Sequence, residues 1–198
     1  DIDGNIMGTL FVDKLDPQSG TSLEIGSSGD TITIPSGATI TNNGTQTGFG
    51  GVNTPLFSIK CGTQSLANQT MTKIQFDTES GNFFDPSGVF DTSNNRVTPS
   101  STGYYLFGCA VTIQDVGDGK KFQMQLRKNG AAFFTGTGQA DYMNTAGLND
   151  NLTTCGTWLV NHSTASDYYE VFCLQNKGST QDTRGDFNNN FWGVKLIS

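Results

Sequence analysis

The sequence has few charged side chains, one histidine and no long apolar segment. Of its 198 residues, 18 are acidic and 11 basic, which gives a net charge of −7 and argues against binding to nucleic-acid phosphates. No apolar run approaches the roughly 20 residues that a membrane-spanning helix needs, so we expect no membrane insertion. Catalysis by a Ser-His-Asp or Cys-His arrangement has only His162 as a candidate base. We therefore expect that the protein is not an enzyme.

Paired cysteines are also missing. The four cysteines are Cys61, Cys109, Cys155 and Cys173, and no two of them are close enough in sequence for a zinc knuckle or a thioredoxin-type pair. Each lies among apolar neighbours in a candidate strand, which favours four small buried side chains. A disulfide such as Cys109–Cys173 is the alternative interpretation.

Glycine is abundant, with 25 residues, while hydrophobic residues make up only 34% of the chain. This composition favours short strands joined by polar turns, hence an all-β protein. Asn129-Gly130, between two short segments, is a strong hairpin signal. After residue 54, strands are expected at 55–61, 71–76, 88–91, 103–113, 122–127, 131–135, 152–160, 168–174 and 191–197.

The first quarter of the chain differs from the rest. Residues 1–51 hold short alternating segments such as Thr31-Ile32-Thr33-Ile34, separated by Gly- and Pro-containing turns. So few apolar residues cannot form a core in one copy, whereas three copies can place their isoleucines on a shared axis. We predict a fibrous trimeric β shaft and hinge over 1–51, followed by a head over 52–198; a flexible linker is the alternative for 1–51. The isoleucines expected in the trimer core of the shaft are Ile25, Ile32, Ile34 and Ile40.

Several motifs of the head occur in a recognisable order. They are Asn82, Phe84-Asp85, Gly88-Val89-Phe90, Pro99, Gly103-Tyr104-Tyr105-Leu106-Phe107 and Phe191-Trp192-Gly193-Val194-Lys195-Leu196. Over about Pro55–Ser198 this pattern resembles the globular head of complement C1q, a branch of the tumour-necrosis-factor-like jelly rolls. Two departures are Val97, where an aromatic residue is common, and a Pro99–Gly103 spacer that is one residue longer than the family pattern.

The resemblance implies a C1q-like antiparallel jelly-roll sandwich that assembles as a homotrimer. The partners of each chain would then be two identical chains. We expect Phe84, Tyr105 and Phe191 to contribute to the trimer core of the head. Aromatic residues of these strands should also fill the interior of the sandwich.

The loops of the predicted head sort into two ends. In antiparallel strands every second connection lies at the same end, so loops 114–119, 136–150 and 175–190 gather at a tip. Shorter connections, 128–130 and 161–167, lie at the other end with the termini of the head. Loops displayed on a rigid sandwich commonly carry binding sites. The candidate receptor-binding residues at the tip are Asp115, Asp118, Lys120, Asp141, Tyr142, Asn144, Asp182, Arg184 and Asp186.

Carboxylates are frequent among these tip residues. Around a threefold axis they would be triplicated, and crowded carboxylates favour a hard cation such as Ca²⁺. Asp118, Asp141 and Asp186 are the candidate ligands. The alternative is solvated loop charge without a metal, and no other cofactor is expected.

The segment Gly29–Ile40, Gly-Asp-Thr-Ile-Thr-Ile-Pro-Ser-Gly-Ala-Thr-Ile, resembles shaft sequences of marine phage fibres. This resemblance implies a virion protein: the distal knob of a bacteriophage tail or head fibre, attaching the virion to a host-cell receptor. Its partners would be other fibre or tail proteins and a host-surface glycan or outer-membrane protein. The alternatives are a structural trimerisation cap without receptor binding and a secreted C1q-like ligand.

Overall fold

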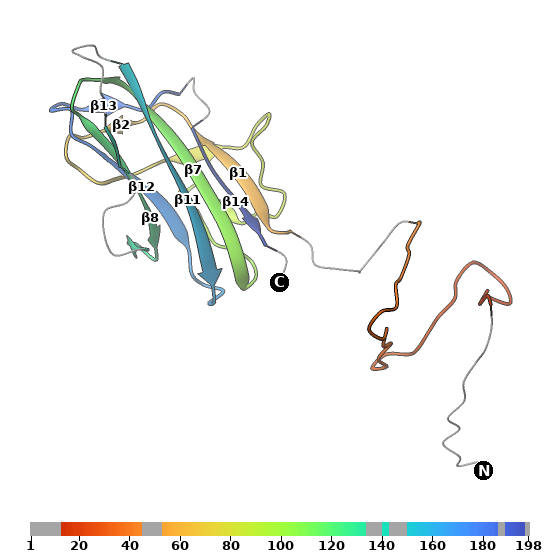
Figure 1. Ribbon diagram of the computed structural model, residues 1–198. Coiled ribbons are helices and arrows are strands. Elements are labelled where there is room, and N and C mark those ends of the chain that lie inside the picture. The colour runs from red at the N-terminus through yellow and green to blue at the C-terminus, as the bar shows by residue number, and fades with distance from the viewer. Residues whose placement is uncertain (1–12, 45–52, 134–139, 143–149, 186–188, 197–198) are drawn as a thin grey trace. The chain divides into compact units, whose positions relative to one another are not determined.

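The computed structural model describes residues 13–44, 53–133, 140–142, 150–185 and 189–196 (Figure 1). The chain divides into two units, Asp1–Thr47 and Gly48–Ser198. The predicted boundary at residue 51 lies outside the described residues. All regular elements in the described ranges are β-strands. A search of these ranges finds no helix that could span a membrane.

Residues 13–44 form turns but no paired strands. The predicted turn at Pro35-Ser36-Gly37 is present: Ala38 N donates to Pro35 O at 3.1 Å, and Gly37 takes a φ of 86°. A second turn is closed by Asp30 N donating to Ser27 O at 3.0 Å. No side chain of this segment is buried in the single chain, because nothing in one copy covers its isoleucines. The trimeric shaft therefore remains a prediction.

The second unit is built from two antiparallel sheets. The first sheet has, in spatial order, β11 (Asp150–His162), β7 (Gly103–Val116), β14 (Asn190–Lys195), β1 (Leu56–Cys61) and β4 (Phe76–Thr78). The second has β10 (Ala140–Tyr142), β8 (Lys121–Lys128), β12 (Tyr169–Gln175), β6 (Arg96–Val97) and β5 (Phe90–Asp91), with β3 (Thr72–Lys73) on β12 and β9 (Ala131–Ala132) on β8. A separate small pair joins β13 (Gln181–Asp182) to β2 (Ser65–Leu66).

Along the chain the long strands alternate between the two sheets: β7, β11 and β14 lie in the first, and β8 and β12 in the second. This crossing pattern is that of a jelly-roll sandwich and confirms the predicted fold class of the head. Figure 1 shows the sheets packed face to face, with β12 and β8 on one side and β11, β7, β14 and β1 on the other.

Aromatic rings fill the space between the sheets. Phe107 lies 5.1 Å from Tyr169 of the opposite sheet and 5.8 Å from Phe191, measured between ring centroids. Phe57 lies 5.1 Å from Phe191. All four of these side chains are at most 3% exposed. Such tilted and edge-on contacts are the favoured geometry for aromatic pairs, so the core is closed within a single copy.

Turn residues predicted from the sequence set the connections. Gly88 N donates to Asp85 O at 3.1 Å, and Asp85 Oδ2 accepts from Phe90 N at 2.6 Å. Asn129 and Gly130 both take positive φ, 52° and 80°, as a two-residue hairpin of type I′ requires. The Asn129 side chain also accepts from Tyr168 N at 3.0 Å, which ties the β8–β9 hairpin to the start of β12.

Three details of the predicted strands were wrong. The strand expected at 71–76 is two strands, β3 and β4, which belong to different sheets. The expected loops 136–150 and 175–190 contain the short strands β10 and β13. These pieces are two or three residues long and pair with distant segments, so no local periodicity indicates them.

Candidate functional site

The ladder registers place the connections at two ends of the sandwich. At one end, the base, Gly103 of β7 is opposite His162 of β11, and Leu56 of β1 is opposite Val194 of β14. At the other, the tip, Val116 of β7 is opposite Asp150, and Gln175 of β12 is opposite Phe122. The described strand ends that flank loops 114–119, 136–150 and 175–190 therefore meet at the tip, as the alternation of strands predicts, although residues 136–139, 143–149 and 186–188 lie outside the described residues.

Two of the candidate residues at the tip, Asp182 and Arg184, lie on or just after β13, which pairs with β2. Asp182 is opposite Ser65 and accepts from its hydroxyl at 2.5 Å. Arg184 N donates to Thr112 O at 2.9 Å, and its guanidinium donates to Asn151 Oδ1 at 3.2 Å. These contacts hold the β13 segment against β7 and β11, so both candidates also have a structural role.

A second group of candidates lies on β10, at the end of β7 and in the β7–β8 turn. Tyr142 is opposite Lys121 and is 66% exposed, while Asp141 is opposite Phe122 and half-buried. Both residues lie on a strand, whereas the sequence predicted a loop. Asp115 and Asp118 are exposed, and Lys120 closes the turn by donating from its N to Gly117 O at 3.2 Å. The remaining two candidates, Asn144 and Asp186, lie outside the described residues.

The calcium hypothesis rests on Asp118, Asp141 and Asp186, and Asp186 is not described. Within the described ranges, no group of three His, Cys, Asp or Glu side chains is placed to hold a metal. The metal therefore stays an untested alternative to solvated loop charge.

A different surface emerges from the outer face of the first sheet. Leu159, Leu106, Val194 and Leu56 are cross-strand neighbours, one from each of β11, β7, β14 and β1. The next row on the same face is formed by Thr157, Gly108, Trp192, Ser58 and Phe84. We call these two rows, together with Tyr104, the outer apolar face. It carries no charged side chain.

The outer apolar face leaves large hydrophobic groups in contact with solvent in the single chain. Leu159 is 62% exposed, Tyr104 52% and Phe84 44%. These are three of the four large hydrophobic residues classed as exposed in the described part of the second unit, and Tyr142 is the fourth. A contiguous exposed apolar patch of this kind indicates an interaction surface.

Glycine shapes this face at one position. A Cβ atom on Gly108 would lie 2.1 Å from Cζ2 of Trp192, so the indole lies directly across the backbone of β7. Any larger residue at position 108 would push the indole away from the sheet. The glycine therefore keeps the centre of the outer apolar face flat.

The predicted trimer-core residues of the head need a correction. Phe84 lies on the outer apolar face, but Tyr105 and Phe191 are each 1% exposed and are buried inside one copy. Their neighbours Tyr104 and Trp192 are the residues that point outward. Adjacent aromatic residues give no alternation, and a shift of one residue in a strand exchanges the two faces. The shaft residues Ile25, Ile32, Ile34 and Ile40 are 47–60% exposed in the single chain.

His162, the one candidate catalytic base, is fully buried at the end of β11, not in a polar turn as the sequence suggested. Its ring lies 5.7 Å from that of Tyr105, and its Nδ1 is 3.3 Å from the Tyr169 hydroxyl. Burial lowers the pKa of His162 below its usual 6.5 and raises the pKa of Tyr169 to about 12. An imidazole in this position is a core residue out of reach of an external substrate.

All four cysteines are free, so the Cys109–Cys173 disulfide is wrong. Cys61, Cys109 and Cys173 are buried as predicted, and burial raises the pKa of the Cys61 thiol to about 11. Such thiols are poor nucleophiles. Cys155 is the exception, because it is exposed opposite Ala110, beside the outer apolar face.

Comparison with known proteins gives structural similarity only. No protein-family profile matches the chain. No curated protein matches it either. Among solved structures, it is similar to the globular domain of zebrafish complement 1qA, with 13% identity over 72% of this chain and 96% of that one, and a TM-score of 0.46. Murine APRIL gives 16% identity over 71% and 98%, and Eiger TNF from S. frugiperda 13% over 71% and 91%, each with a TM-score of 0.45. The fold assignment itself rests on the strand order of the two sheets.

Proposed function

We propose that the chain is the distal part of a homotrimeric bacteriophage fibre, with a β shaft followed by a jelly-roll head that attaches the virion to a host-cell surface. The observation that carries this proposal is where the exposed hydrophobic side chains lie. Six lie in residues 13–44 and three on the outer apolar face of the head. Both regions need covering, and identical copies supply matching surfaces without a further partner.

Assembly through the outer apolar face leaves the tip free. The tip connections lie at the opposite end from Leu56, where the chain enters the head. Tyr142, a largely exposed aromatic ring at the tip, suits stacking against a sugar. Three equivalent tips on one trimer would bind a repeated surface receptor more tightly than one, because the second and third contacts become intramolecular.

The first experiment measures assembly. Light scattering of the full chain at micromolar concentration should give the mass of three chains, whereas a folded single-chain species would contradict the proposal. Removal of the head, residues 52–198, then separates attachment from capping. Shaft trimers that no longer adsorb to host cells support a receptor-binding head, and loss of the trimers supports a head that acts as a trimerisation cap.

The second experiment concerns the tip. Tyr142→Ala should weaken adsorption of the trimer to host cells, and Asp186→Lys should do the same. Tyr168→Ala is a matched control, because Tyr168 is a partly exposed tyrosine at the base end of β12. Unchanged adsorption by both tip variants would move receptor binding away from the tip.

A further inference from the structure

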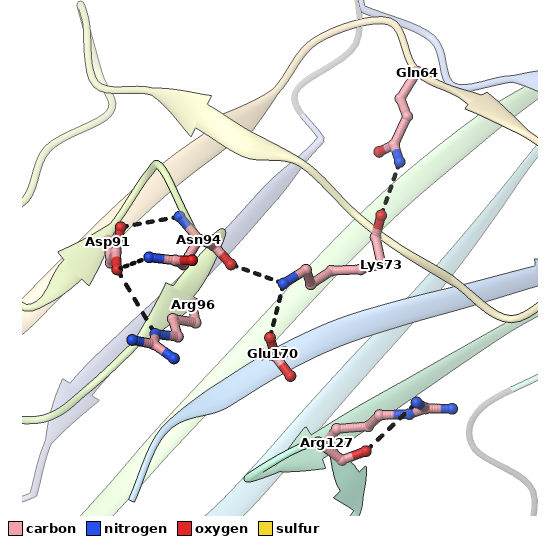
Figure 2. Close-up of polar contacts among 8 residues, drawn as sticks. Gln64, Lys73, Asp91, Asn94, Arg96, Arg127 and Glu170 are labelled. Carbon is pink, nitrogen blue, oxygen red and sulfur yellow. Dashed lines mark hydrogen bonds and ion pairs between the residues drawn. The ribbon is translucent and has the colours of Figure 1, made fainter. Parts of the chain in front are cut away.

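The outer face of the second sheet differs in chemistry from the outer apolar face. Arg127 is opposite Glu170, and Gln125 is opposite Phe172, which is in turn opposite Lys73 of β3. Charged, amide and aromatic side chains therefore share this surface, which we call the mixed face. Figure 2 shows its polar contacts.

Three cations of the mixed face and its base edge are already paired with carboxylates. Lys73 Nζ is 2.9 Å from Glu170 Oε1 and also donates to Asn94 O at 2.9 Å (Figure 2). Arg96 Nε is 3.7 Å from Asp91 Oδ2, and Lys128 Nζ is 2.6 Å from Asp167 Oδ2.

Arg127 differs from these three cations. Glu170 is its cross-strand neighbour, but the Glu170 carboxylate is bonded to Lys73. No carboxylate in the described part of the chain lies within ion-pair distance of Arg127.

The guanidinium of Arg127 is nevertheless held in place. Its central carbon lies 4.0 Å from the centroid of the Phe172 ring, so it stacks on that ring. Its Nε donates to Gln125 Oε1 at 3.0 Å, and one terminal nitrogen reaches Gly130 O at 3.5 Å. A stacked and hydrogen-bonded guanidinium loses little conformational freedom when it binds a ligand.

From these contacts we propose that the mixed face, centred on Arg127 and Phe172, binds a sugar that carries a carboxylate. The planar guanidinium matches a carboxylate through two parallel hydrogen bonds. Phe172 and Leu174, both half-buried, offer apolar surface to a sugar ring, and the Gln125 amide offers hydrogen bonds to hydroxyls. One carboxylate in an otherwise neutral glycan fits the one guanidinium stacked on Phe172, whereas a densely charged polymer would be repelled by the acidic chain.

The test uses the full chain and two oligosaccharides that differ at one sugar. The probe contains one glucuronic acid residue, and its partner contains glucose at that place. Saturation-transfer NMR and calorimetry should detect binding of the acidic probe, and at least tenfold weaker binding of the neutral one. Three results would overturn the proposal. They are equal binding of the acidic and neutral oligosaccharides, stronger binding of a sulfated form of the neutral oligosaccharide, and no binding of either oligosaccharide.

Variants then locate the site. Arg127→Gln should weaken binding of the acidic probe at least tenfold. Arg127→Lys should weaken it by a smaller factor, because lysine keeps the charge but lacks the two parallel donors of the guanidinium. Arg96→Gln is the matched control: it removes the same charge from a guanidinium that stacks on an aromatic ring, Tyr168, at 4.6 Å, but is already paired with Asp91. It should change binding less than twofold. Equal losses in Arg96→Gln and Arg127→Gln would mean a general charge effect and overturn the assignment.

This inference does not depend on attachment through the tip. Tyr142→Ala should leave binding of the acidic probe unchanged, because Tyr142 pairs with Lys121 at the tip end of β8 and Arg127 lies near its base end. Loss of probe binding in Tyr142→Ala, with Arg127→Gln unaffected, would place the sugar at the tip instead. A monomeric chain that still binds the probe would refute the proposed fibre and leave the mixed face standing.

Discussion

The two units of this chain treat their hydrophobic residues in opposite ways. In residues 13–44, the large apolar side chains are all exposed, from Leu23 at 43% to Ile32 at 60%. In the head, Ile59, Phe107 and Met124 are completely buried between two sheets. Both segments contain alternating apolar and polar residues, but of the two only the head has paired strands and a facing sheet that cover its apolar side chains.

The comparison shows that an alternating sequence pattern alone does not make a stable strand; the strand also needs other parts of the protein to pair with it. An alternating segment becomes a stable strand when another strand takes its hydrogen bonds and another surface covers its apolar face. The head supplies both within one copy, whereas residues 13–44 supply neither. The outer apolar face is an intermediate case, since its strands are paired but its outward row of leucines is uncovered.

The largest effect is expected from an interior truncation of the head. Phe107→Ala should reduce the free energy of unfolding by about 3–5 kcal/mol, because it removes a ring that contacts Phe57, Tyr169 and Phe191. Urea denaturation followed by tryptophan fluorescence measures this loss. A change below about 1 kcal/mol would mean that the head is not closed within one copy.

The second largest effect is expected on the association of chains through the outer apolar face. Leu159→Lys places a charge on the outer apolar face at a residue that is 62% exposed and contributes little to the fold of one copy. We expect association of the proposed trimer to weaken at least tenfold, about 1.4 kcal/mol, while the circular dichroism spectrum stays unchanged.

Sedimentation measures the association directly, and the exposed thiol of Cys155 gives a second readout. Cys155 lies on β11 beside Thr157, so it should react with a thiol reagent faster in the Leu159→Lys variant than in the assembled wild type. Tyr142→Lys is the control, since Tyr142 is equally exposed but lies off this face. A Leu159→Lys protein that assembles like the wild type would show that other copies do not cover the leucines.

A smaller effect on the head is expected from the isoleucines. Ile32→Thr combined with Ile34→Thr should leave the unfolding midpoint of the head within about 0.5 kcal/mol of wild type. The same variant should make residues 13–44 of the trimer easier to cleave by protease, because the shared core of the predicted shaft loses its apolar side chains. Unchanged cleavage would favour the flexible-linker alternative.

The smallest effect concerns pH. Burial lowers the pKa of His162 in the folded head, so the unfolded chain binds the proton more readily. Stability should therefore fall as the pH decreases through about 6.5 and level off below the folded-state pKa. The pKa of Asp167 is lowered from 3.8 by its bonds to Lys128 and Asn129, so its contribution is lost only at a lower pH. Melting curves between pH 8 and 5 should show a shallower slope in His162→Gln, and equal slopes would contradict the assignment.

Much of the head could be predicted from particular residues. The expected strand at 152–160 is present within β11, where Trp158 and Val160 are buried and Leu159 is exposed, and Asn129-Gly130 gave the correct hairpin. Both signals are local, because a side-chain period of two and a pair of positive φ angles depend on neighbours in sequence. The order of the loops at the two ends followed from the strand count alone.

Other features depend on partners that the sequence does not identify. β13 exists because Gln181 pairs with Leu66, more than a hundred residues away. The stacking of Arg127 on Phe172 depends on the register of β8 against β12, and neither residue belongs to a motif. Tyr104 and Tyr105 look alike in sequence, yet one faces solvent and the other the core.

The position of β1 has a mechanical consequence. The strand enters at Leu56 at the base and lies between β14 and β4, with its hydrogen bonds perpendicular to the strand direction. If the tip attaches as proposed, a pull between the tip and the incoming chain would act along β1 and load these bonds in shear, all at once. A strand held in this way resists extraction better than one unzipped bond by bond, so the head is suited to stay folded at the end of a tether under tension.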